Sequence, residues 1–259
     1  MSVTTLLRSS ISFLLLFFLV GCGAGYSPPT KQAELLVSAA ASLSDAMTEM
    51  KHAFELENPA IIVTYTFGSS GKLATQIEQG APSDLFLSAS QKDMDRLQQK
   101  NAILTGSRIN FASNELALIT RKDSPIHTTS FDALASVPFT HLAIGEPESV
   151  PAGRYAKETL THLGFWTQVK EKLVFASDVR QVLAYVESGN AEVGIVYTSD
   201  VKTSGKVKVL GEAKPEWHKP IQYPGAVLSS SAHQKEAQLF LDYIRSEKGQ
   251  SILKAYGFQ

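Results

Sequence analysis

Apolar and polar residues alternate along this chain with two different periods. Short apolar runs of strand length are followed by longer stretches in which apolar residues recur every three or four positions, as Met47, Met50 and Phe54 do. The pattern predicts strands at 34–40, 61–67, 84–89, 116–120, 141–145, 173–176 and 193–197. It predicts helices at 44–57, 71–79, 93–100, 152–163 and 179–187, and a long amphipathic helical stretch at 234–254.

The order of these elements predicts the fold class. Strands that alternate with amphipathic helices favour parallel sheets joined by crossover helices, which is the α/β class. No internal repeat of fixed period is visible. Glycines at 80, 164 and 189 follow three helices by a residue or two, where a left-handed residue commonly closes the last turn.

Four predicted helices open on small or hydroxyl-bearing residues directly after a strand. The openings are AAASLSD (39–45), GSSG (68–71), VPAG (150–153) and SDV (177–179). Pro151 suits a first helical turn, and Asp178 is a candidate N-cap. Each helix start should lie at the carboxyl edge of a sheet, where free N–H groups and the helix dipole favour an anion. One such start is ordinary capping, but several at equivalent strand ends indicate an anion site.

The segment FGSSGKLATQIEQG (67–80) resembles the end of a phosphate-binding loop. That loop needs Gly five residues before its Gly-Lys pair and Ser or Thr directly after the Lys. Thr66 and Leu73 stand at these positions, so no nucleotide site is predicted.

The first residues predict export and lipidation. Arg8 precedes an apolar run at 11–20, which is too short to span a bilayer and is typical of a signal peptide. The run ends in Leu-Val-Gly-Cys, which resembles the lipobox of bacterial lipoproteins, and Cys22 is the only cysteine. We expect residues 1–21 to be a lipoprotein signal peptide, Cys22 to be lipidated, and 22–32 to be a flexible tether. The alternative is an ordinary cleaved signal with an unrelated cysteine.

Composition narrows the possible functions. The 259 residues are 44% hydrophobic and 19% charged, which is typical of a globular chain with one large or two medium domains. A formal net charge of −1 gives no support for a nucleic-acid partner, which needs a basic face. The six histidines show no paired spacing such as His-x3-His, so no metal centre is predicted.

Six segments carry a resemblance to a known family. They are AAASL (39–43), FGSSGKLA (67–74), GAPSDLFLSA (80–89), GEPESVPAGRYA (145–156), SDVR (177–180) and GIVYTSD (194–200). In this order, from about residue 34 to the C-terminus, the chain resembles the molybdate-binding proteins of ABC importers. The resemblance implies a type II periplasmic binding protein, in which two α/β lobes close on the ligand about two crossing strands. It implies a first lobe at 33–113 plus 229–259, a second at 114–222, and hinge strands near 115–120 and at 223–228.

The resemblance also implies a set of ligand-binding residues. Molybdate or tungstate would be held by neutral donors: Ser42 and Ser70 through hydroxyl and backbone N–H, Ala152 and Val179 through backbone N–H, and Tyr197 through its phenol. Molybdenum would be bound only as the oxyanion, without a cofactor. The implied partners are the permease and ATPase of an ABC importer, with the membrane reached only through the lipid. We expect a monomer without enzymatic activity.

The chemistry of these residues suits a dianion. Hydrogen bonds to a charged acceptor are stronger than neutral ones, so converging dipoles can replace a countercharge. A site made of donors also disfavours a protonated oxyanion, whose O–H needs an acceptor. We assign the nearby Asp45 and Asp178 to helix capping and Lys72, where family members often carry Thr, to the solvated helix surface. Sulfate differs from molybdate mainly in size and stays open as an alternative ligand.

A serine acyl enzyme of the cell envelope is the rival from another class. Ser69 and Lys72 form Ser-x-x-Lys at a helix start, and 188–190 form Ser-x-Asn. The third motif, Lys-Thr-Gly, is absent, because 202–205 read Lys-Thr-Ser-Gly. A fluorescent penicillin that labels the protein stoichiometrically, and fails to label Ser69→Ala, would establish this rival.

Overall fold

The computed structural model describes residues 32–128, 130–136 and 138–259. Residues 32–259 form one compact unit. The predicted signal peptide, Cys22 and nearly all of the tether lie outside the described residues. Within the described part, no helix is long and apolar enough to cross a membrane.

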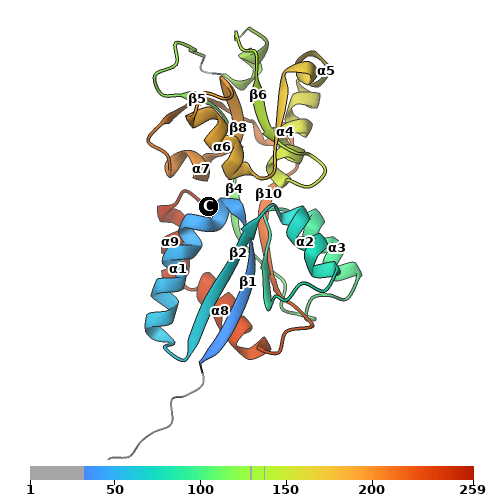
Figure 1. Ribbon diagram of the computed structural model, residues 1–259, viewed down its shortest axis with the longest axis vertical. Helices are drawn as coiled ribbons and strands as arrows, with labels where there is room; N and C mark the ends of the chain where they lie inside the picture. The colour runs from blue at the N-terminus through green and yellow to red at the C-terminus, as the bar shows by residue number, and fades with distance from the viewer. Residues whose placement is uncertain (1–31, 129, 137) are drawn as a thin grey trace, which may run out of the picture. The chain divides into compact units, whose positions relative to one another are not determined.

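Two five-stranded sheets organise this unit (Figure 1). The first has the order β2-β1-β3-β10-β4, with β1 at Ala33–Ala40, β2 at Ile61–Gly68, β3 at Leu85–Leu87, β4 at Ile109–Asn114 and β10 at Ile221–Val227. The second has the order β7-β6-β8-β5-β9, with β5 at Leu116–Arg121, β6 at Leu142–Gly145, β7 at Leu173–Ala176, β8 at Val193–Tyr197 and β9 at Val207–Glu212.

Helices cover both sheets. Those beside the first sheet are α1 (Ser44–Glu57), α2 (Ser70–Glu78), α3 (Gln91–Gln99), α8 (Gln234–Arg245) and α9 (Glu247–Ala255). Those beside the second are α4 (Pro151–His162), α5 (Trp166–Val169), α6 (Val179–Glu187) and α7 (Thr198–Lys202). Short 3-10 turns are η1 (Ala41–Leu43), η2 (Phe131–Ser136), η3 (Lys170–Lys172) and η4 (Pro215–Trp217). We call each sheet with its helices the first and the second lobe.

The α/β class is confirmed, but the expectation of parallel sheets is wrong. β1 runs parallel to β2 and β3, and β6 runs parallel to β7 and β8, whereas β10 and β5 run antiparallel to their neighbours. These two strands carry the chain from one lobe into the other. β5, for example, begins with Leu116 paired to Tyr197, the last residue of β8. A strand that enters at the carboxyl end of its neighbour must run against it, and both sheets are therefore mixed.

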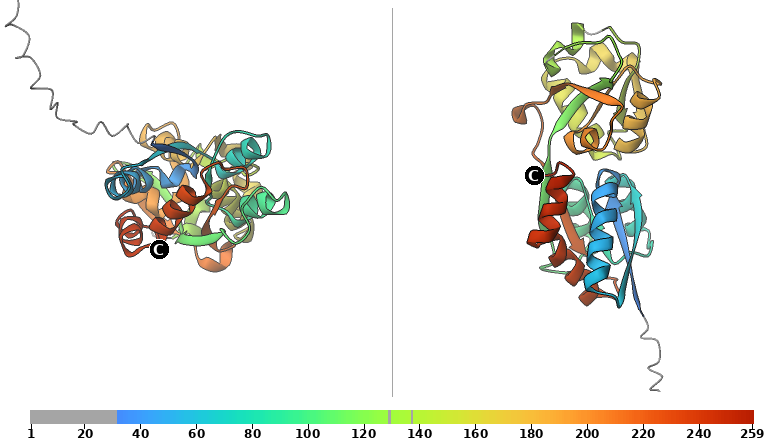
Figure 2. Two further views of the ribbon diagram at one scale, coloured as in Figure 1. Left: turned by 90° about the horizontal axis from the view of Figure 1, so that it is seen from below. Right: turned by 90° about the vertical axis from the view of Figure 1, so that its left-hand side faces the viewer.

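The chain crosses between the lobes in two places (Figure 2). The first crossing is the single residue Glu115 between β4 and β5, and the second is 213–220 between β9 and β10. Most of 223–228, predicted as the return strand of the hinge, lies in β10, which pairs with β3 and β4 of the first sheet. The exact lobe boundaries, and any movement about these crossings, remain predictions.

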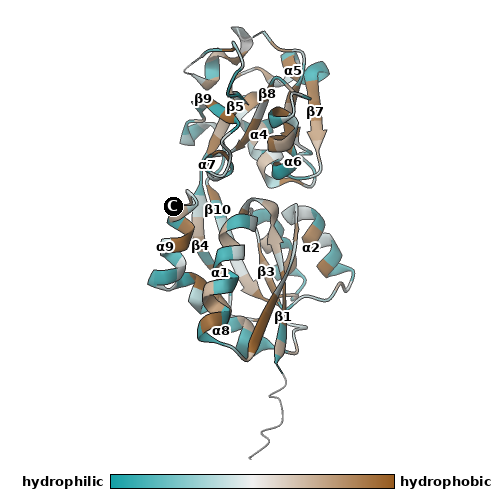
Figure 3. Ribbon diagram, turned by 60° about the vertical axis from the view of Figure 1, so that its left-hand side comes forward, coloured by the Kyte–Doolittle hydropathy of each residue, from teal (hydrophilic) through white to brown (hydrophobic). Residues whose placement is uncertain are grey.

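The apolar faces predicted from the sequence are buried. On α1, Met47, Met50 and Phe54 have no exposed surface, and the interior strand β1 buries Leu35 and Ala39 completely. Figure 3 shows the hydrophobic residues on the strands and the inner sides of the helices, with hydrophilic residues outside. Burial of each large aliphatic or aromatic side chain contributes about 1.5–3 kcal/mol, so these faces fix each helix against its sheet.

The predicted helical stretch at 234–254 is two helices rather than one. Ser246 adopts an extended conformation (φ −62°, ψ 164°), and its Oγ accepts a hydrogen bond from the Gly249 N–H at 3.2 Å. It thereby ends α8 and caps α9. The glycines predicted to close helices do so, because Gly80, Gly164 and Gly189 have φ of +89°, +74° and +77°.

Gly153 packs its Cα against the backbone of β6, which sets the start of α4. A Cβ built at Gly153 would lie 1.9 Å from the Gly145 carbonyl oxygen. We expect Gly153→Ala to destabilise the protein by about 1–3 kcal/mol through overpacking, which lowers Tm by roughly 2–10 °C. Thermal unfolding followed by circular dichroism measures this. Gly205→Ala is the matched control, because no described atom beyond its chain neighbours lies within 4 Å of its Cβ position. Equal Tm values for both variants would contradict the packing argument.

Candidate functional site

Four helix starts meet at one cavity between the lobes. The starts of η1 and α2 follow β1 and β2, and those of α4 and α6 follow β6 and β7, so all four lie at carboxyl ends of parallel strands. The cavity measures about 200 Å³, including the part open to solvent. Its lining consists of Ala40, Ala41, Ser42, Gly68, Ser69, Ser70, Ala89, Val150, Pro151, Ala152, Asp178, Val179 and Tyr197. All five residues predicted to bind the ligand are brought together here, while their contacts with a ligand remain predictions.

The helix starts leave backbone donors at the cavity. The N-cap residues of α2 and α4, Ser69 and Val150, make no side-chain capping bond, so they do not engage the N–H groups of the first turns. α6 is capped as predicted, since Asp178 Oδ1 accepts the Gln181 N–H at 3.0 Å. That bond uses the third N–H of the helix and does not engage the N–H of Val179. The positive ends of these helix dipoles therefore favour an anion.

Two serine hydroxyls at the cavity have partners behind them. Ser70 is fully buried, and its Oγ accepts a hydrogen bond from the Ala89 N–H at 3.0 Å. Ser42 Oγ lies 3.0 Å from Tyr223 Oη of β10. In each case a protein group lies on one side of the hydroxyl, which holds the side chain in place at the edge of the cavity.

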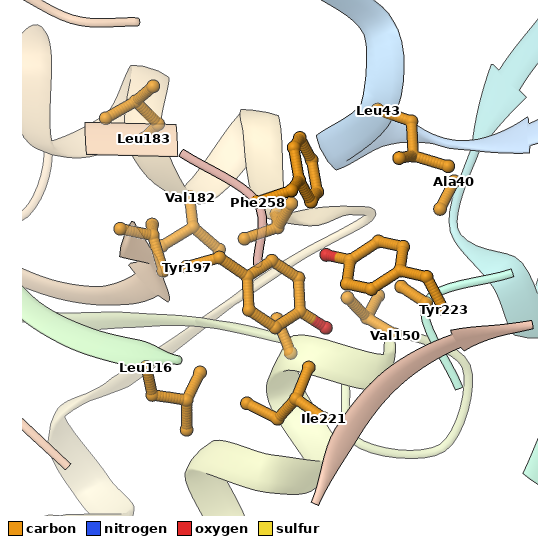
Figure 4. Close-up of a cluster of buried hydrophobic side chains, with 14 of the residues drawn as sticks. Ala40, Leu43, Leu116, Val150, Val182, Leu183, Tyr197, Ile221, Tyr223 and Phe258 are labelled. Carbon is orange, nitrogen blue, oxygen red and sulfur yellow. The ribbon is translucent and has the colours of Figure 1, made fainter. Parts of the chain in front are cut away.

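Two further hydroxyls at the cavity have no hydrogen-bond partner in the part of the chain that the structure describes. Tyr197 Oη and Ser69 Oγ are both buried, and neither has a hydrogen-bond partner among the described residues. Burial raises the pKa of Tyr197 well above its usual value, which keeps its phenol protonated and able to donate. Figure 4 shows the Tyr197 and Tyr223 rings near each other among apolar side chains, with centroids 6.0 Å apart. Unpaired buried hydroxyls are costly and point to a ligand as the missing acceptor.

Among the described residues, no lysine, arginine or histidine lines the cavity. Lys72 is exposed on α2, as predicted. Asp178 is the one charged residue of the described ranges that lines the cavity, and it is engaged in capping. The other capping assignment is wrong: α1 has Leu43 as its N-cap, and Asp45 instead pairs with Arg180 of the second lobe. The charge of Arg180 is therefore balanced by Asp45, and this arginine does not line the cavity.

Three contacts join the lobes around the cavity. The Gly71 N–H donates to the Ser149 carbonyl oxygen at 3.0 Å, directly beside the start of α2. Arg154 of α4 pairs with Asp93 of α3, and these side chains are only 13% and 4% exposed. The third contact is the pair between Arg180 of α6 and Asp45 of α1. The lobes therefore meet in specific polar contacts on more than one side of the site.

Asp200 of α7 is a buried acid beside this network. Its carboxylate accepts the Tyr197 N–H at 3.1 Å and lies 3.3 Å from Arg180 Nη1. Burial is the largest influence and raises the pKa of Asp200 to about 7, although Arg180 lowers it. An unfolded aspartate titrates near 3.9, so the folded protein holds an extra proton between about pH 4 and pH 7. This stabilising contribution is fully present below about pH 4 and is lost progressively as the pH rises to about 7.

We therefore expect the Tm of Asp200→Asn to rise relative to that of the unmodified protein when the pH is raised from 5 to 8. The asparagine does not ionise, so it avoids the cost of a buried charge at high pH. Thermal unfolding at both pH values measures the difference, with the exposed residue change Asp242→Asn as the control. A difference that stays constant with pH would contradict the raised pKa.

Comparison with known proteins defines the class. Residues 35–259 match the family described as bacterial extracellular solute-binding proteins. YvgL of Bacillus subtilis strain 168, named as an ABC transporter substrate-binding lipoprotein, is 41% identical over 251 residues, 96% of each chain. The molybdate-binding protein ModA of Escherichia coli K12 is 40% identical over 231 residues, 88% of this chain and 89% of that one. The solved periplasmic molybdate-binding protein of Azotobacter vinelandii superposes with a TM-score of 0.80 at 26% identity, covering 87% of this chain and 98% of that one.

This chain belongs to the bacterial extracellular solute-binding protein family. The expected fold of two α/β lobes is confirmed. The family has an extracytoplasmic transport role rather than a catalytic one, which speaks against the serine acyl enzyme. Among the described residues, no group of histidine, cysteine, aspartate and glutamate side chains is arranged to hold a metal ion.

Two polar residues at or directly behind the cavity were not predicted to belong to the ligand site. Ser69 lines the cavity beside Ser70, but a serine at a helix start indicates a cap, and the sequence offers nothing to show that no capping bond forms. Tyr223 lies behind Ser42 although 181 residues separate them in the chain. No local pattern could have found this contact.

Proposed function

We propose that this protein captures molybdate, and also tungstate, outside the cytoplasm and passes it to the permease and ATPase of an ABC importer. The proposal rests on the cavity, which is small and lined by hydroxyls and helix starts. Among the described residues, no cationic side chain lines it. Such a site binds a small dianion through fixed dipoles and charge-assisted hydrogen bonds. The identity to ModA of Escherichia coli supports molybdate as that dianion.

In this proposal, each lobe contributes part of the ligand shell. The first lobe supplies hydroxyl and backbone donors at Ser42 and Ser70. The second supplies the backbone N–H groups of Ala152 and Val179 and the Tyr197 phenol, which has no partner among the described residues. An oxyanion first held by one lobe would draw the other toward it, and closure completes the shell. The crossings at 115 and 213–220 are the positions proposed for the hinge.

We also propose that the lipid on Cys22 anchors the protein to a membrane, outside the cytoplasm. The Leu-Val-Gly-Cys motif supports this, as does the name of YvgL, a substrate-binding lipoprotein that is 41% identical. Residues 22–32 would then act as the tether to the folded unit, and the protein would work as a monomer. Mass spectrometry of the membrane-extracted protein tests the anchor. Cys22→Ser should abolish the lipid, and an unlipidated wild-type Cys22 would refute it.

Calorimetric titration with molybdate, tungstate, sulfate and phosphate tests the ligand. We expect tight binding with one ligand per protein for molybdate and tungstate, and much weaker binding for the other two. Phosphate carries an O–H at neutral pH that a donor-only shell leaves without an acceptor. Sulfate is the alternative ligand, and tight binding of sulfate with weak binding of molybdate would move the protein to another class of oxyanion.

A further inference from the structure

Tyr223 lies between the site and the crossing from β4 to β5. It is fully buried on β10 and does not line the cavity. Its phenol oxygen contacts two side chains, Ser42 Oγ at 3.0 Å and Asn114 Nδ2 at 3.3 Å. Asn114 is the last residue of β4, directly before the crossing. A polar chain therefore runs from the crossing to a hydroxyl at the cavity.

The orientation of the Asn114 amide fixes one end of this chain. Its Oδ1 accepts the Glu115 N–H and the Thr198 hydroxyl, both at 3.0 Å. Its Nδ2 donates to Ser199 Oγ at 2.8 Å. Turning the amide around would place the NH₂ group against the Glu115 N–H, which can only donate, so Nδ2 is the group that meets Tyr223. Asn114 therefore donates to the phenol oxygen.

The direction of the next hydrogen bond follows from counting protons. Tyr223 has a single O–H, and an amide proton already approaches its oxygen. Among the described residues, the acceptor within reach of the phenol proton is Ser42 Oγ. A phenol that accepted from both Asn114 and Ser42 would leave its own buried proton without an acceptor, so donation from Tyr223 to Ser42 is the arrangement that satisfies both groups. It leaves the serine proton free for the cavity that Ser42 lines.

We propose that Tyr223, oriented by Asn114, makes Ser42 a hydrogen-bond donor to the ligand and thereby sets the preference of the site for fully deprotonated oxyanions. This inference rests on the proposed function. It assigns a positioning role to a residue that touches no ligand. Ser70 is arranged in a similar way, because the Ala89 N–H donates to its oxygen. A side-chain change can remove the donor behind Ser42, whereas the donor behind Ser70 belongs to the backbone.

Tyr223→Phe tests the inference, since it removes only the phenol oxygen. The ring keeps its packing against Phe111 and Phe258, whose centroids lie 6.2 and 5.3 Å away. Without Tyr223 as donor, the Ser42 hydroxyl is free to rotate and accept a proton from HPO4²⁻. We expect molybdate affinity to fall by roughly 3- to 10-fold, the effect of one hydrogen bond. We expect phosphate affinity to stay constant or rise, so the preference for molybdate over phosphate falls by at least the same factor.

The experiment uses full-length protein in detergent and compares four forms by calorimetry: wild type, Tyr223→Phe, Ser42→Ala and the double variant. If Tyr223 acts through Ser42, Tyr223→Phe has no further effect on affinity in the Ser42→Ala background. Tyr243→Phe, on α8 and outside the cavity, is the matched control and should leave both affinities unchanged.

The outcomes separate this inference from the proposed function. Wild-type protein that fails to bind molybdate defeats the proposed function itself. Wild-type binding with an unchanged molybdate-to-phosphate preference in Tyr223→Phe overturns the inference alone. Additive effects of the two changes overturn it as well, because they mean that Tyr223 does not act through Ser42. A Tm for ligand-free Tyr223→Phe close to that of wild type shows that the fold is intact in this comparison.

Discussion

Replacing Ser42 and Ser70 together by alanine is expected to weaken molybdate binding by about 10²- to 10⁴-fold. Each change removes one hydrogen bond to a charged acceptor, which contributes about 1.5–3 kcal/mol, and each 1.4 kcal/mol corresponds to a factor of ten. Both side chains are nearly or fully buried at the cavity, so water cannot readily replace the lost donors. Calorimetric titration of the double variant with molybdate measures the loss.

The matched control for this pair is Ser188→Ala with Ser230→Ala, two exposed serines outside the cavity. It should bind molybdate as the unmodified protein does. Unchanged affinity in the Ser42 and Ser70 double variant would remove the basis of the site assignment.

Replacing Arg154 by methionine is expected to weaken molybdate binding by about 10²-fold, because closure of the lobes becomes less favourable. Arg154 lies on α4 and Asp93 on α3, so the ion pair forms only when the lobes are together. Removing one partner of a buried pair costs about 3–5 kcal/mol, because the other charge stays buried. Opening the lobes rehydrates Asp93 and avoids part of this cost, so the loss appears in ligand affinity more than in the stability of either lobe.

The pKa of Asp93 adds a pH dependence to this prediction. Burial raises it, and the neighbouring Arg154 lowers it. Without the arginine, closure should favour protonated Asp93, so the affinity of Arg154→Met should weaken further as the pH rises. Adding Asp93→Asn should recover much of the affinity and abolish the pH dependence. Calorimetry at pH 6 and pH 8 measures both effects.

Arg108→Met is the control for an ion pair within one lobe, since Arg108 Nη1 lies 2.7 Å from Asp95 Oδ1. It should leave the affinity for molybdate unchanged. A fall in Tm without a loss of affinity in Arg154→Met would instead assign the Asp93 pair to ordinary stabilisation.

The sequence predicted the local elements best where the period was strong. The helix at 179–187 and the strand at 193–197 have the predicted bounds, because apolar periodicity and capping residues mark their ends. The strands at 109–114 and 207–212 were not predicted, because their sequences, INFASN and VKVLGE, do not resemble buried apolar runs. Whether neighbouring strands run parallel or antiparallel could not be predicted from a local pattern either, because it depends on where the chain crosses between the lobes.

At the site, too, local features could be predicted and contacts between distant residues could not. The helix starts were visible in the sequence, and the residues at 42, 70, 152, 179 and 197 line one cavity. Contacts between distant residues were not visible. Asp45 was assigned to a cap because capping is local, whereas its partner Arg180 lies 135 residues away. The bond between Tyr223 and Ser42 is of the same kind, and it joins strand β10 to the start of another helix.

In the proposed function, a bare oxyanion sits between the lobes and is held by neutral donors. Anomalous diffraction from crystals grown with tungstate or molybdate tests this most directly, because the metal atom is located without reference to the protein. We expect a single strong peak in the cavity, with oxyanion oxygens within hydrogen-bond distance of Ser42, Ser70, Tyr197 and the backbone N–H groups of Ala152 and Val179. A peak outside the cavity, or an oxyanion bound by a lysine or arginine side chain, would rule out this mode of binding.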